Sequence, residues 1–422
     1  MRLAFFPFHD QFIAFDGDSL HVSIVSSEEK KRLEAIAASD RDQCETANQC
    51  DDRMSTLVLH VSNTCNMACA YCFANHGKYR SEDALMSVDT ALAAVDRYLD
   101  RYGEMKEIKF FGGEPLCAWP VIEETVLHVE ARYGGLESRR LPTFRIITNG
   151  TLLNDQMIAF IALHRIKVVF SIDGPRDLHD SLRYDKGGKG TLEKIDRQFW
   201  RLREMTSGQQ PQGIDVTYTA EHIRTGYGIA RLVEALSQKY AVPPEKINVS
   251  LVSADPDSPF YIEDEYACIC ESLRQYQEHP DMADQKVSVL LKRLRKGKQV
   301  GTAICGAGGS WAAVSSTGDV YPCLMFVDEP TLHMGNVHDE HLFQTERWNM
   351  IHDHLSGLRQ SSARGCDLCP YNRLCSSCMG INSFHTGSFD VVSEEDCRIT
   401  REKIEWCIRC IAQEQWQQRI EK

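Results

Sequence analysis

Long apolar runs and basic tracts are both missing from this sequence. The longest uninterrupted apolar run is residues 157–163, only seven residues, whereas a helix needs about 20 to cross a bilayer. A transmembrane helix is therefore not expected. Acidic residues outnumber basic ones by 60 to 47, which gives a net charge of −13, and nucleic acids and anionic membranes attract proteins of the opposite sign. The composition therefore argues against a nucleic-acid binder and against a membrane-surface binder.

A secretory signal peptide is also missing. The first apolar run turns polar at His9 and Asp10 and has no small-residue cleavage site, so a cytoplasmic location is expected. In that reducing compartment disulfides are a poor explanation for 17 cysteines, and their odd number leaves at least one unpaired. Metal or iron-sulfur ligation is the better interpretation. The cysteines gather in two regions, residues 65–72 and residues 305–410.

A repeated strand-and-helix unit fills the chain between residues 56 and 252. The predicted strands are residues 57–62, 107–111, 144–148, 167–172, 215–219 and 246–252. The predicted helices between them include residues 87–102, 121–132, 155–164 and 191–203. This alternation predicts a parallel sheet in an α/β fold. Six units indicate a partial (β/α)6 TIM-like barrel, whose chemistry is expected at the carboxyl ends of the strands.

The flanking segments differ from the barrel, and the chain divides into five predicted parts. They are a small α+β appendage (1–52), the barrel (53–255), bridging helices (256–304), a cysteine-rich domain (305–400) and a C-terminal helix (401–422). The appendage has apolar runs at residues 3–8, 12–15 and 20–24, followed by a charged helix at 27–38. The final helix is predicted to begin at residue 394 and to end at 420.

The first cysteine cluster, Cys65-x3-Cys69-x2-Cys72, directly follows the first predicted strand. Three thiolates on one loop can hold three irons of a four-iron cluster and leave the fourth iron open, because full ligation takes four cysteines. An open iron can bind a substrate or cofactor. A structural zinc site is the alternative. It would need a fourth ligand such as His76, and it usually shows Cys-x2-Cys pairs rather than this spacing.

This spacing, with the aromatic Tyr71 before the third cysteine, resembles the radical S-adenosylmethionine (SAM) superfamily. The resemblance covers roughly residues 57–252 and implies that Cys65, Cys69 and Cys72 carry the catalytic cluster. It also implies that the open iron chelates the amino and carboxylate groups of SAM and that reductive cleavage yields a 5′-deoxyadenosyl radical. The cofactor supplies that chemistry, while the protein orients and shields it.

A Gly-Gly-Glu-Pro motif ends the second predicted strand, where this family has the same motif. Gly112 and Gly113 would let the backbone approach a ligand closely. Glu114 would accept a hydrogen bond from the ammonium group of SAM. Outside this context the four residues would be a simple turn.

Polar residues also stand at the ends of the next two strands. Asn149, Ser171 and Asp173 suit the ribose hydroxyls or the carboxylate of SAM, although each could instead cap a helix. Arg183 belongs to a stretch, Asp173-Gly-Pro-x3-His-Asp-x2-Arg, that resembles one in the peptide-modifying branch. It would pair with the cofactor carboxylate, and a surface salt bridge is the alternative.

The second cysteine region resembles the SPASM extension, which carries auxiliary iron-sulfur clusters in radical enzymes that modify ribosomal peptides. The resemblance implies one cluster fully ligated by Cys366, Cys369, Cys375 and Cys397, and another held by Cys305, Cys323 and Cys378. The cofactors would thus be SAM and three 4Fe-4S clusters. One departure affects Cys378, because two residues separate it from Cys375 where the family commonly has three.

The second auxiliary set has only three members, which leaves two alternatives. Its fourth iron is open, or a fourth ligand comes from Cys117, Cys268 or Cys270. A zinc ribbon is a further alternative for the whole region. An open iron favours thioether formation, because a soft thiolate from the substrate would complete the cluster.

The resemblance therefore predicts a radical SAM peptide maturase that installs thioether crosslinks, as in sactipeptide and ranthipeptide enzymes. Its expected partners are a ribosomal precursor peptide and an electron donor such as flavodoxin or ferredoxin. Residues 1–52 have the order of a short leader-peptide recognition element, which binds peptides by β-augmentation, or they simply cap the barrel. Formylglycine generation of the sulfatase-maturase type, carbon-carbon crosslinking and a noncatalytic iron-sulfur or zinc protein are the rival functions.

Overall fold

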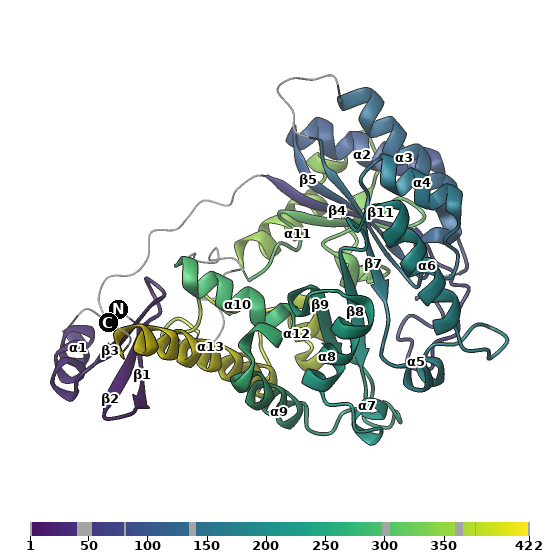
Figure 1. Ribbon diagram of the computed structural model, residues 1–422. Coiled ribbons are helices and arrows are strands. Elements are labelled where there is room, and N and C mark those ends of the chain that lie inside the picture. Colours follow the sequence, from purple (N-terminus) through teal and green to yellow (C-terminus); the bar gives the residue numbers. More distant parts are fainter. Residues whose placement is uncertain are drawn as a thin grey trace.

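The computed structural model describes residues 2–39, 53–79, 82–134, 141–297, 304–358, 366–375 and 377–420. Its main feature is a sheet with the strand order β12-β11-β10-β4-β5-β6-β7-β8-β9 (Figure 1). The barrel strands are β4 Met54–Ser62, β5 Met105–Gly112, β6 Thr143–Thr148, β7 Lys167–Ser171, β8 Gly213–Tyr218 and β9 Ile247–Leu251. Each pairs in parallel with the next. The predicted six-unit partial barrel is confirmed.

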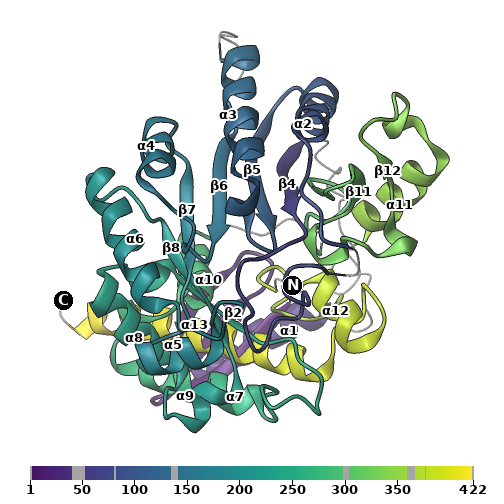
Figure 2. The ribbon, with the colours of Figure 1, turned by 90° about the vertical axis from the view of Figure 1, so that its right-hand side faces the viewer.

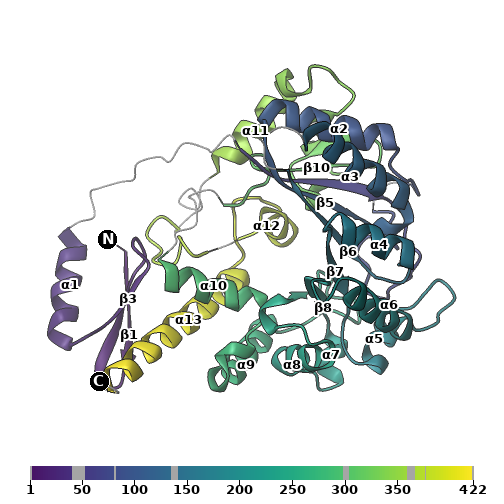
Figure 3. The same ribbon diagram turned by 45° about the horizontal axis from the view of Figure 1, so that its top comes forward.

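Helices cover the convex side of this curved sheet, as Figure 3 shows. They are α2 Val88–Tyr102, α3 Trp119–Tyr133, α4 Asp155–Leu163, α5 Arg176–Leu182, α6 Leu192–Met205, α7 Ala220–Arg224 and α8 Ile229–Tyr240. Local sequence sets their ends. Ser87 caps α2 by accepting a hydrogen bond from the Thr90 backbone N–H, and Gly103 ends that helix at a φ of 76°.

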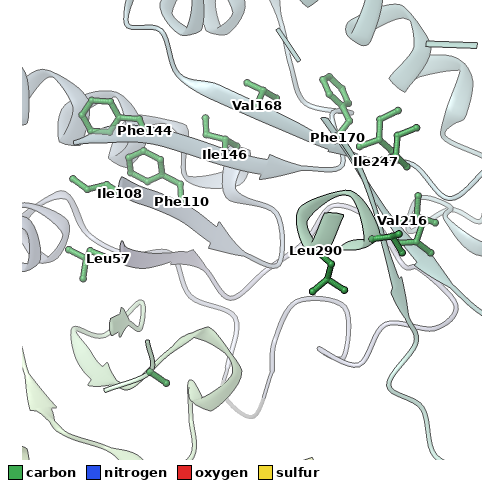
Figure 4. Close-up of a cluster of buried hydrophobic side chains, with 14 of the residues drawn as sticks. Leu57, Ile108, Phe110, Phe144, Ile146, Val168, Phe170, Val216, Ile247 and Leu290 are labelled. Carbon is green, nitrogen blue, oxygen red and sulfur yellow. The ribbon is translucent and has the colours of Figure 1, made fainter. Parts of the chain in front are cut away.

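The two faces of the sheet differ in polarity. Apolar side chains such as Ile108, Phe110 and Phe144 pack between the strands and the outer helices (Figure 4). Glu107 and Lys109 are neighbours of Ile108 and Phe110 along β5. Their side chains point to the inner side, because successive side chains of a strand point to opposite faces. The barrel therefore keeps its core on the outside and charged groups on the inside.

The cysteine-rich region continues the same sheet rather than forming a detached unit. Strand β10 (Trp311–Val314) pairs in parallel with β4, and β11 (Asp319–Tyr321) and β12 (Gly335–Asn336) extend the sheet antiparallel. Figure 2 shows β11, β12 and α11 (Glu346–Gly357) beyond β4. Helix α12 (Met379–Thr386) lies on the concave side of the sheet (Figure 3).

The N-terminal appendage, predicted as a small α+β unit, contains a separate antiparallel sheet. It contains β1 (Leu3–Phe8), β2 (Gln11–Asp16) and β3 (His21–Val25), followed by α1 (Ser27–Ser39). The sheet packs on the C-terminal helix α13 (Glu394–Ile420), whose bounds match the predicted helix. Phe15 stacks on Tyr371 with ring centroids 6.1 Å apart, and Phe8 meets Trp416 edge-on.

Two helices, α9 (Glu265–Glu278) and α10 (Gln285–Lys296), connect the barrel to the cysteine-rich region and pack against α13. None of the helices in the described part of the chain has the length and apolar character needed to cross a membrane.

Candidate functional site

The predicted catalytic cysteines lie on the loop that follows β4. The Cys72 N–H donates to the Cys69 carbonyl at 3.2 Å. Burial raises the pKa of Cys65 to about 12, and the nearby Cys69 thiol adds to this shift. Burial likewise raises the pKa of Cys69 to about 11, and the nearby Cys72 thiol adds to that shift. The three thiols are therefore neighbours on one partly buried loop. Such a donor set fits three corners of a four-iron cluster.

The alternative weighed for this loop, a mononuclear zinc site, would need a fourth ligand beside the three thiols. His76, its expected fourth ligand, is exposed to solvent. Within the described ranges, no three or more His, Cys, Asp or Glu side chains are grouped to bind a single metal ion, whereas the thiolates around a four-iron cluster each bind a different iron.

The cysteine loop rests on the last residue of α5 and on the segment that follows it. The Ala68 N–H donates to the Tyr184 carbonyl and the Ala70 N–H donates to the Leu182 carbonyl, both at 2.9 Å. Met67 also forms an isolated antiparallel bridge with Asp185. Strand-like pairing therefore holds the backbone between the first and third cysteines.

The two glycines of the Gly-Gly-Glu-Pro motif lie against this loop. A Cβ atom at Gly113 would lie 2.4 Å from the Thr64 carbonyl oxygen, and one at Gly112 would lie 2.2 Å from the Ser62 carbonyl oxygen. Gly112 also has a φ of 138°, which side chains rarely allow. The glycines therefore permit close approach, to the last residue of β4 for Gly112 and to the cysteine loop for Gly113.

Glu114 is only 1% exposed and joins the ends of two strands. Its Oε1 accepts from the Leu116 N–H at 3.0 Å and from the Thr148 hydroxyl at 2.6 Å, and its Oε2 accepts from the Asn149 N–H at 2.8 Å. Burial raises the pKa of this carboxyl, against the lowering effect of these hydrogen bonds. Oε2 keeps the capacity to accept one more donor.

Asn149 lies beside the first cysteine, at the end of β6. Its Nδ2 donates to Asn66 Oδ1 at 3.0 Å and approaches Cys65 Sγ at 3.9 Å. Thr151 donates to Asn149 Oδ1 and accepts from Asn66 Nδ2, both at 2.7 Å. Asn66 and Thr151 were missed from the sequence, because their partnership depends on two loops that are 85 residues apart.

The end of β7 carries Ser171 and Asp173, and these two predicted cofactor contacts differ in exposure. Ser171 is partly exposed, whereas Asp173 is 0% exposed. Asp173 Oδ2 accepts from the Tyr71 hydroxyl at 2.5 Å and from Arg183 Nε at 2.8 Å, and Oδ1 accepts from the Thr217 N–H at 3.0 Å. The Asp173 carboxylate therefore faces protein donors.

Arg183 and Asp173 form a buried ion pair, with side-chain exposures of 11% and 0%. Arg183 therefore forms a salt bridge within the protein, as in the alternative weighed for it, but this salt bridge lies inside the protein rather than on its surface. Burial alone would raise the pKa of Asp173, but the charge of Arg183, followed by those of His179 and His222, holds it below its usual value. Because Asp173 also binds Tyr71, this ion pair ties the cysteine loop to the end of β7.

Four predicted ligands converge on one cavity in the cysteine-rich region. The cavity has a volume of about 150 Å³, and its lining includes Cys366, Cys369, Cys375 and Cys397. Burial raises the pKa of Cys375 to about 11, and the three other thiols contribute to the shift. Arg401 also lines the cavity, and the neighbouring Cys397 is the main cause of its raised pKa. The four thiols fit a fully ligated cluster.

The other three predicted auxiliary ligands form a separate group. Burial raises the pKa of Cys323 to about 12, and the Cys378 and Cys305 thiols add to the shift. Cys305 accepts hydrogen bonds from the Ala307 and Met379 N–H groups. Cys378 stands at the start of α12. Its unusual spacing from Cys375 therefore does not remove it from the Cys305 group.

The candidates for a fourth ligand lie elsewhere. The Cys117 thiol accepts from the Asn66 N–H and lies near Cys65. Cys268 lies near Asp264 and Glu265 at the start of α9, and the Cys270 side chain binds Tyr266. Among the described residues, no fourth thiol stands with Cys305, Cys323 and Cys378 in the causes that shift the pKa of Cys305 and Cys323. Cys44 and Cys50 lie outside the described residues.

Two family models match the chain. Residues 59–208 match the model described as the radical SAM superfamily, and residues 305–379 match SPASM, described as an iron-sulfur cluster-binding domain. The cysteine-type anaerobic sulfatase-maturating enzyme of Clostridium perfringens (strain ATCC 13124) is 23% identical over 342 residues. This alignment covers 76% of this chain and 87% of that enzyme.

Solved structures share the fold. The structure of native anSMEcpe with bound AdoMet has a TM-score of 0.67 at 21% identity and covers 84% of this chain and 97% of that one. Streptococcus suis SuiB bound to precursor peptide SuiA has a TM-score of 0.58 at 14% identity and covers 94% of this chain and 100% of that one. With the cysteine loop, the barrel and both family matches in agreement, the chain is a radical SAM enzyme that carries a SPASM domain.

Proposed function

We propose that this enzyme is a peptide maturase that forms a thioether between a cysteine sulfur and a carbon of another residue in a ribosomal precursor peptide. Two relatives support a polypeptide substrate. SuiB was solved with a precursor peptide, and the Clostridium perfringens relative is by name a sulfatase-maturating enzyme. The broader conclusion, modification of a peptide or protein, rests on both.

The thioether chemistry rests on one observation, the separate group of three thiols formed by Cys305, Cys323 and Cys378. A four-iron cluster held by three protein thiols has one iron without a protein thiolate. A substrate thiolate is a soft ligand of the type that iron-sulfur clusters prefer. It would bring the reacting sulfur to a fixed position.

Different residues of the chain would hold each cofactor. In this proposal Cys65, Cys69 and Cys72 hold the SAM-binding cluster, and Cys366, Cys369, Cys375 and Cys397 hold a closed auxiliary cluster. When bound, SAM and the three clusters supply a hydrogen-abstracting radical and an acceptor for one electron. Glu114, Asn149, Ser171 and Arg183 orient the polar groups of SAM, and Asp173 positions Arg183 and the loop.

The overall reaction balances as a two-electron oxidation of the peptide. A carbon-hydrogen bond and a sulfur-hydrogen bond break, and a carbon-sulfur bond forms. The carbon-bound hydrogen leaves as an atom that 5′-deoxyadenosine retains, the thiol hydrogen leaves as a proton, and one electron returns to the acceptor. An electron donor such as flavodoxin or ferredoxin would start the reaction.

The N-terminal appendage offers a place for the leader of the precursor peptide. A cavity of about 310 Å³ opens beside β3 and is lined by His21, Val22, Ser23, Gln415, Gln418 and Arg419. In the described part of the chain, β3 pairs with β2 and with no other strand. A peptide could add to its free edge as a further strand. A cap on the barrel is the simpler role for the same sheet, whose Val22 carbonyl already accepts from Gln415 Nε2 at 3.1 Å.

Formylglycine generation is the second candidate function. The sulfatase-maturating relative and the TM-score of 0.67 to anSMEcpe favour it. The group of three thiols counts against it, because the resemblance to that branch predicts an eighth cysteine in the SPASM region. The products separate the two functions, since one is a thioether and the other an aldehyde.

The decisive experiment uses the anaerobically reconstituted enzyme and a candidate precursor peptide from a neighbouring gene. The peptide should change the paramagnetic signal of one auxiliary cluster, whereas a Cys→Ser peptide should change it much less. The product should lose the mass of two hydrogens and resist thiol alkylation at the crosslinked cysteine, because carbon-sulfur bond formation consumes the thiol.

A matched enzyme control sharpens that result. Cys268→Ala removes a thiol that lies away from the Cys305 group, so it should leave the signal change intact. An alkylatable product that lacks two hydrogens would indicate carbon-carbon crosslinking instead. An aldehyde product would establish the formylglycine reaction.

A further inference from the structure

Three polar side chains form a closed ring of hydrogen bonds beside the first cysteine of the loop. Asn149 Nδ2 donates to Asn66 Oδ1 at 3.0 Å, and Asn66 Nδ2 donates to the Thr151 hydroxyl at 2.7 Å. That hydroxyl donates to Asn149 Oδ1, also at 2.7 Å. Asn66 belongs to the cysteine loop, whereas Asn149 and Thr151 follow β6. We name Asn66, Asn149 and Thr151 the Asn149 network.

The direction of these bonds fixes how the Asn149 amide is turned. Its Oδ1 also accepts from the Thr151 backbone N–H at 2.9 Å, and a backbone N–H can only donate. An amide turned the other way would place its own N–H groups against that donor. The oxygen of Asn149 therefore faces Thr151, and its nitrogen faces the cysteine loop.

The Asn149 amide has no bonding capacity left for a further group. A side-chain amide offers two acceptor sites and two N–H donors. The Asn149 oxygen accepts from both the N–H and the hydroxyl of Thr151. One N–H binds Asn66, and the nitrogen lies 3.9 Å from Cys65 Sγ, toward which the other N–H can donate. Beyond its own network, Asn149 therefore contacts the cysteine sulfur.

The backbone after β6 holds Asn149 in this position. Gly150 has a φ of 75°, and a Cβ atom there would lie 2.3 Å from the Phe170 ring, so a larger residue would not fit. Asn149 and Thr151 are only 6% and 3% exposed. Hydrogen bonds are stronger in such surroundings than in water, which favours a measurable effect of the contact with sulfur.

Hydrogen bonds to Cys65 would affect the electron affinity of a cluster that it holds. Cys65 Sγ also accepts from the Met67 N–H at 3.4 Å, so a backbone donor and a side-chain donor both face this sulfur. Hydrogen bonds to the sulfurs are among the factors that set the reduction potential of an iron-sulfur cluster. The reduced state carries one more negative charge, so an N–H donor stabilises it more than the oxidised state.

We propose that Asn149, held by Asn66 and Thr151, donates a hydrogen bond to the Cys65 thiolate and thereby raises the reduction potential of the cluster on the cysteine loop. Asn149 is then a positioning residue that acts on SAM through the cluster rather than through a contact of its own. The inference rests on the cluster assignment made in the proposed function, and it is independent of the thioether reaction. A higher potential lets a weaker reductant supply the electron.

A redox titration of the reconstituted holoenzyme, without SAM and without peptide, measures this potential. The paramagnetic signal that is lost in Cys65→Ala/Cys69→Ala/Cys72→Ala identifies the relevant cluster. Asn149→Leu removes both amide donors, so the equilibrium constant for one-electron reduction should fall about tenfold, which lowers the potential by about 59 mV. Asn149→Asp keeps the shape of the side chain but lacks the N–H groups, and it should lower the potential at least as far.

Thr151 and Asn154 provide the matched controls. Thr151→Val keeps the backbone N–H that holds Asn149, so it should lower the potential by less, and Thr151→Ser should restore the original value. Asn154 is an exposed asparagine on the same loop that caps α4 by accepting from the Met157 N–H at 3.0 Å. Asn154→Ala should leave the potential unchanged. An equal shift in Asn154→Ala, or no shift in iron-loaded Asn149→Leu, would overturn the proposal.

A second measurement does not depend on how the variants fold. The asparagine side chains of the otherwise unchanged enzyme are labelled with a nitrogen isotope, and the reduced enzyme is studied by pulsed paramagnetic resonance. The labelled nitrogen should couple weakly to the cluster on the cysteine loop. The coupling should persist in Asn154→Ala and disappear in Asn149→Asp. Its absence from the enzyme with the original sequence would contradict the hydrogen bond to sulfur.

The outcomes also separate this inference from the proposed function. Retention of every cluster signal in the triple cysteine variant would refute the cluster assignment on which both depend. A potential that depends on Asn149, in an enzyme that forms no thioether, would leave the inference standing and remove the thioether proposal. Thioether formation by an enzyme whose potential does not depend on Asn149 would do the reverse.

Discussion

The cysteine loop after β4 and the group formed by Cys305, Cys323 and Cys378 both bring three thiols together, but their surroundings differ. Asn149, Glu114 and the Asp173–Arg183 pair lie around the cysteine loop. The Cys305 group instead has backbone N–H donors and apolar neighbours. Polar side chains suit the amino and carboxylate groups of SAM, whereas apolar surroundings suit a thiolate ligand.

The apolar side of the Cys305 group is partly open. Met325, Ile381 and Phe384 are 43%, 38% and 55% exposed. Met325 packs against α12 so closely that a Cβ at Gly380 would lie 2.7 Å from its Cβ. Met325 follows Cys323 by two residues in the chain, and its exposed apolar side chain is available to a partner. Two sites with the same number of thiols can therefore bind different ligands, because the neighbouring side chains decide what each site can bind.

The largest expected effect comes from deleting either set of thiols. Cys65→Ala/Cys69→Ala/Cys72→Ala should abolish 5′-deoxyadenosine production, whereas Cys305→Ala/Cys323→Ala/Cys378→Ala should keep it and abolish crosslinking. Each variant should lose about four of about twelve irons per chain. Iron analysis and chromatography of the reaction check both. Crosslinking by the second variant would refute the distinction between the two sites.

The next effect concerns the buried ion pair that supports the cysteine loop. Asp173→Asn would leave Arg183 buried without its counter-charge, and breaking a buried pair costs about 3 kcal/mol of unfolding free energy. Urea unfolding followed by circular dichroism measures the loss. Asp155→Asn is the matched control, because Asp155 pairs with Arg201 on the surface. Equal stability of the two variants would show that the Asp173 pair does not support the fold.

A smaller effect is expected for the carboxylate beside Asn149. Glu114→Gln keeps the shape of the side chain but removes its charge, so SAM affinity should fall about tenfold while the iron content stays unchanged. Equilibrium binding of SAM to the reconstituted enzyme measures this. Unchanged affinity would reduce the Gly-Gly-Glu-Pro motif to a structural support for the cysteine loop.

The smallest effect concerns the apolar surface beside the Cys305 group. Met325→Gln should weaken binding of the cysteine-containing peptide about fivefold through lost apolar contact and leave SAM affinity unchanged. Met350→Gln is a suitable control, because Met350 is exposed on α11. Titration of the enzyme with peptide distinguishes the two variants. An equal loss in both would mean that the surface beside the Cys305 group has no special role.

The sequence predicted the barrel because its signals are local. Apolar periodicity located every strand from β4 to β9, and α13 has the predicted bounds. Strand β4 nevertheless begins at Met54, three residues before the predicted start. Strands β5 and β10 both pair with β4, and Met54 already faces Met105. Pairing with neighbouring strands thus extends β4 beyond the start that the apolar pattern alone predicts.

The site was predicted less completely because its contacts join distant segments. The cysteine spacing and the family resemblance indicated the thiol sets, including the place of Cys378 beside Cys305. The hydrogen bond between Tyr71 and Asp173 spans 102 residues and has no sequence pattern of its own. The residue types indicate what chemistry is possible, but the packing of helices and strands decides which residues come together in one site.

The pairing of β10 with β4 gives the SPASM domain a structural role in addition to cluster binding. Residues from Trp311 to Val314 cover the edge of β4 along Thr56 to Leu59, and Leu57, Val58 and Leu59 are fully buried. A chain shortened before Trp311 would present this apolar strand with unpaired N–H and C=O groups, which is a template for association with other chains. Such a fragment would keep every residue of the cysteine loop and still be expected to aggregate, so the auxiliary domain also protects the barrel from strand-to-strand association.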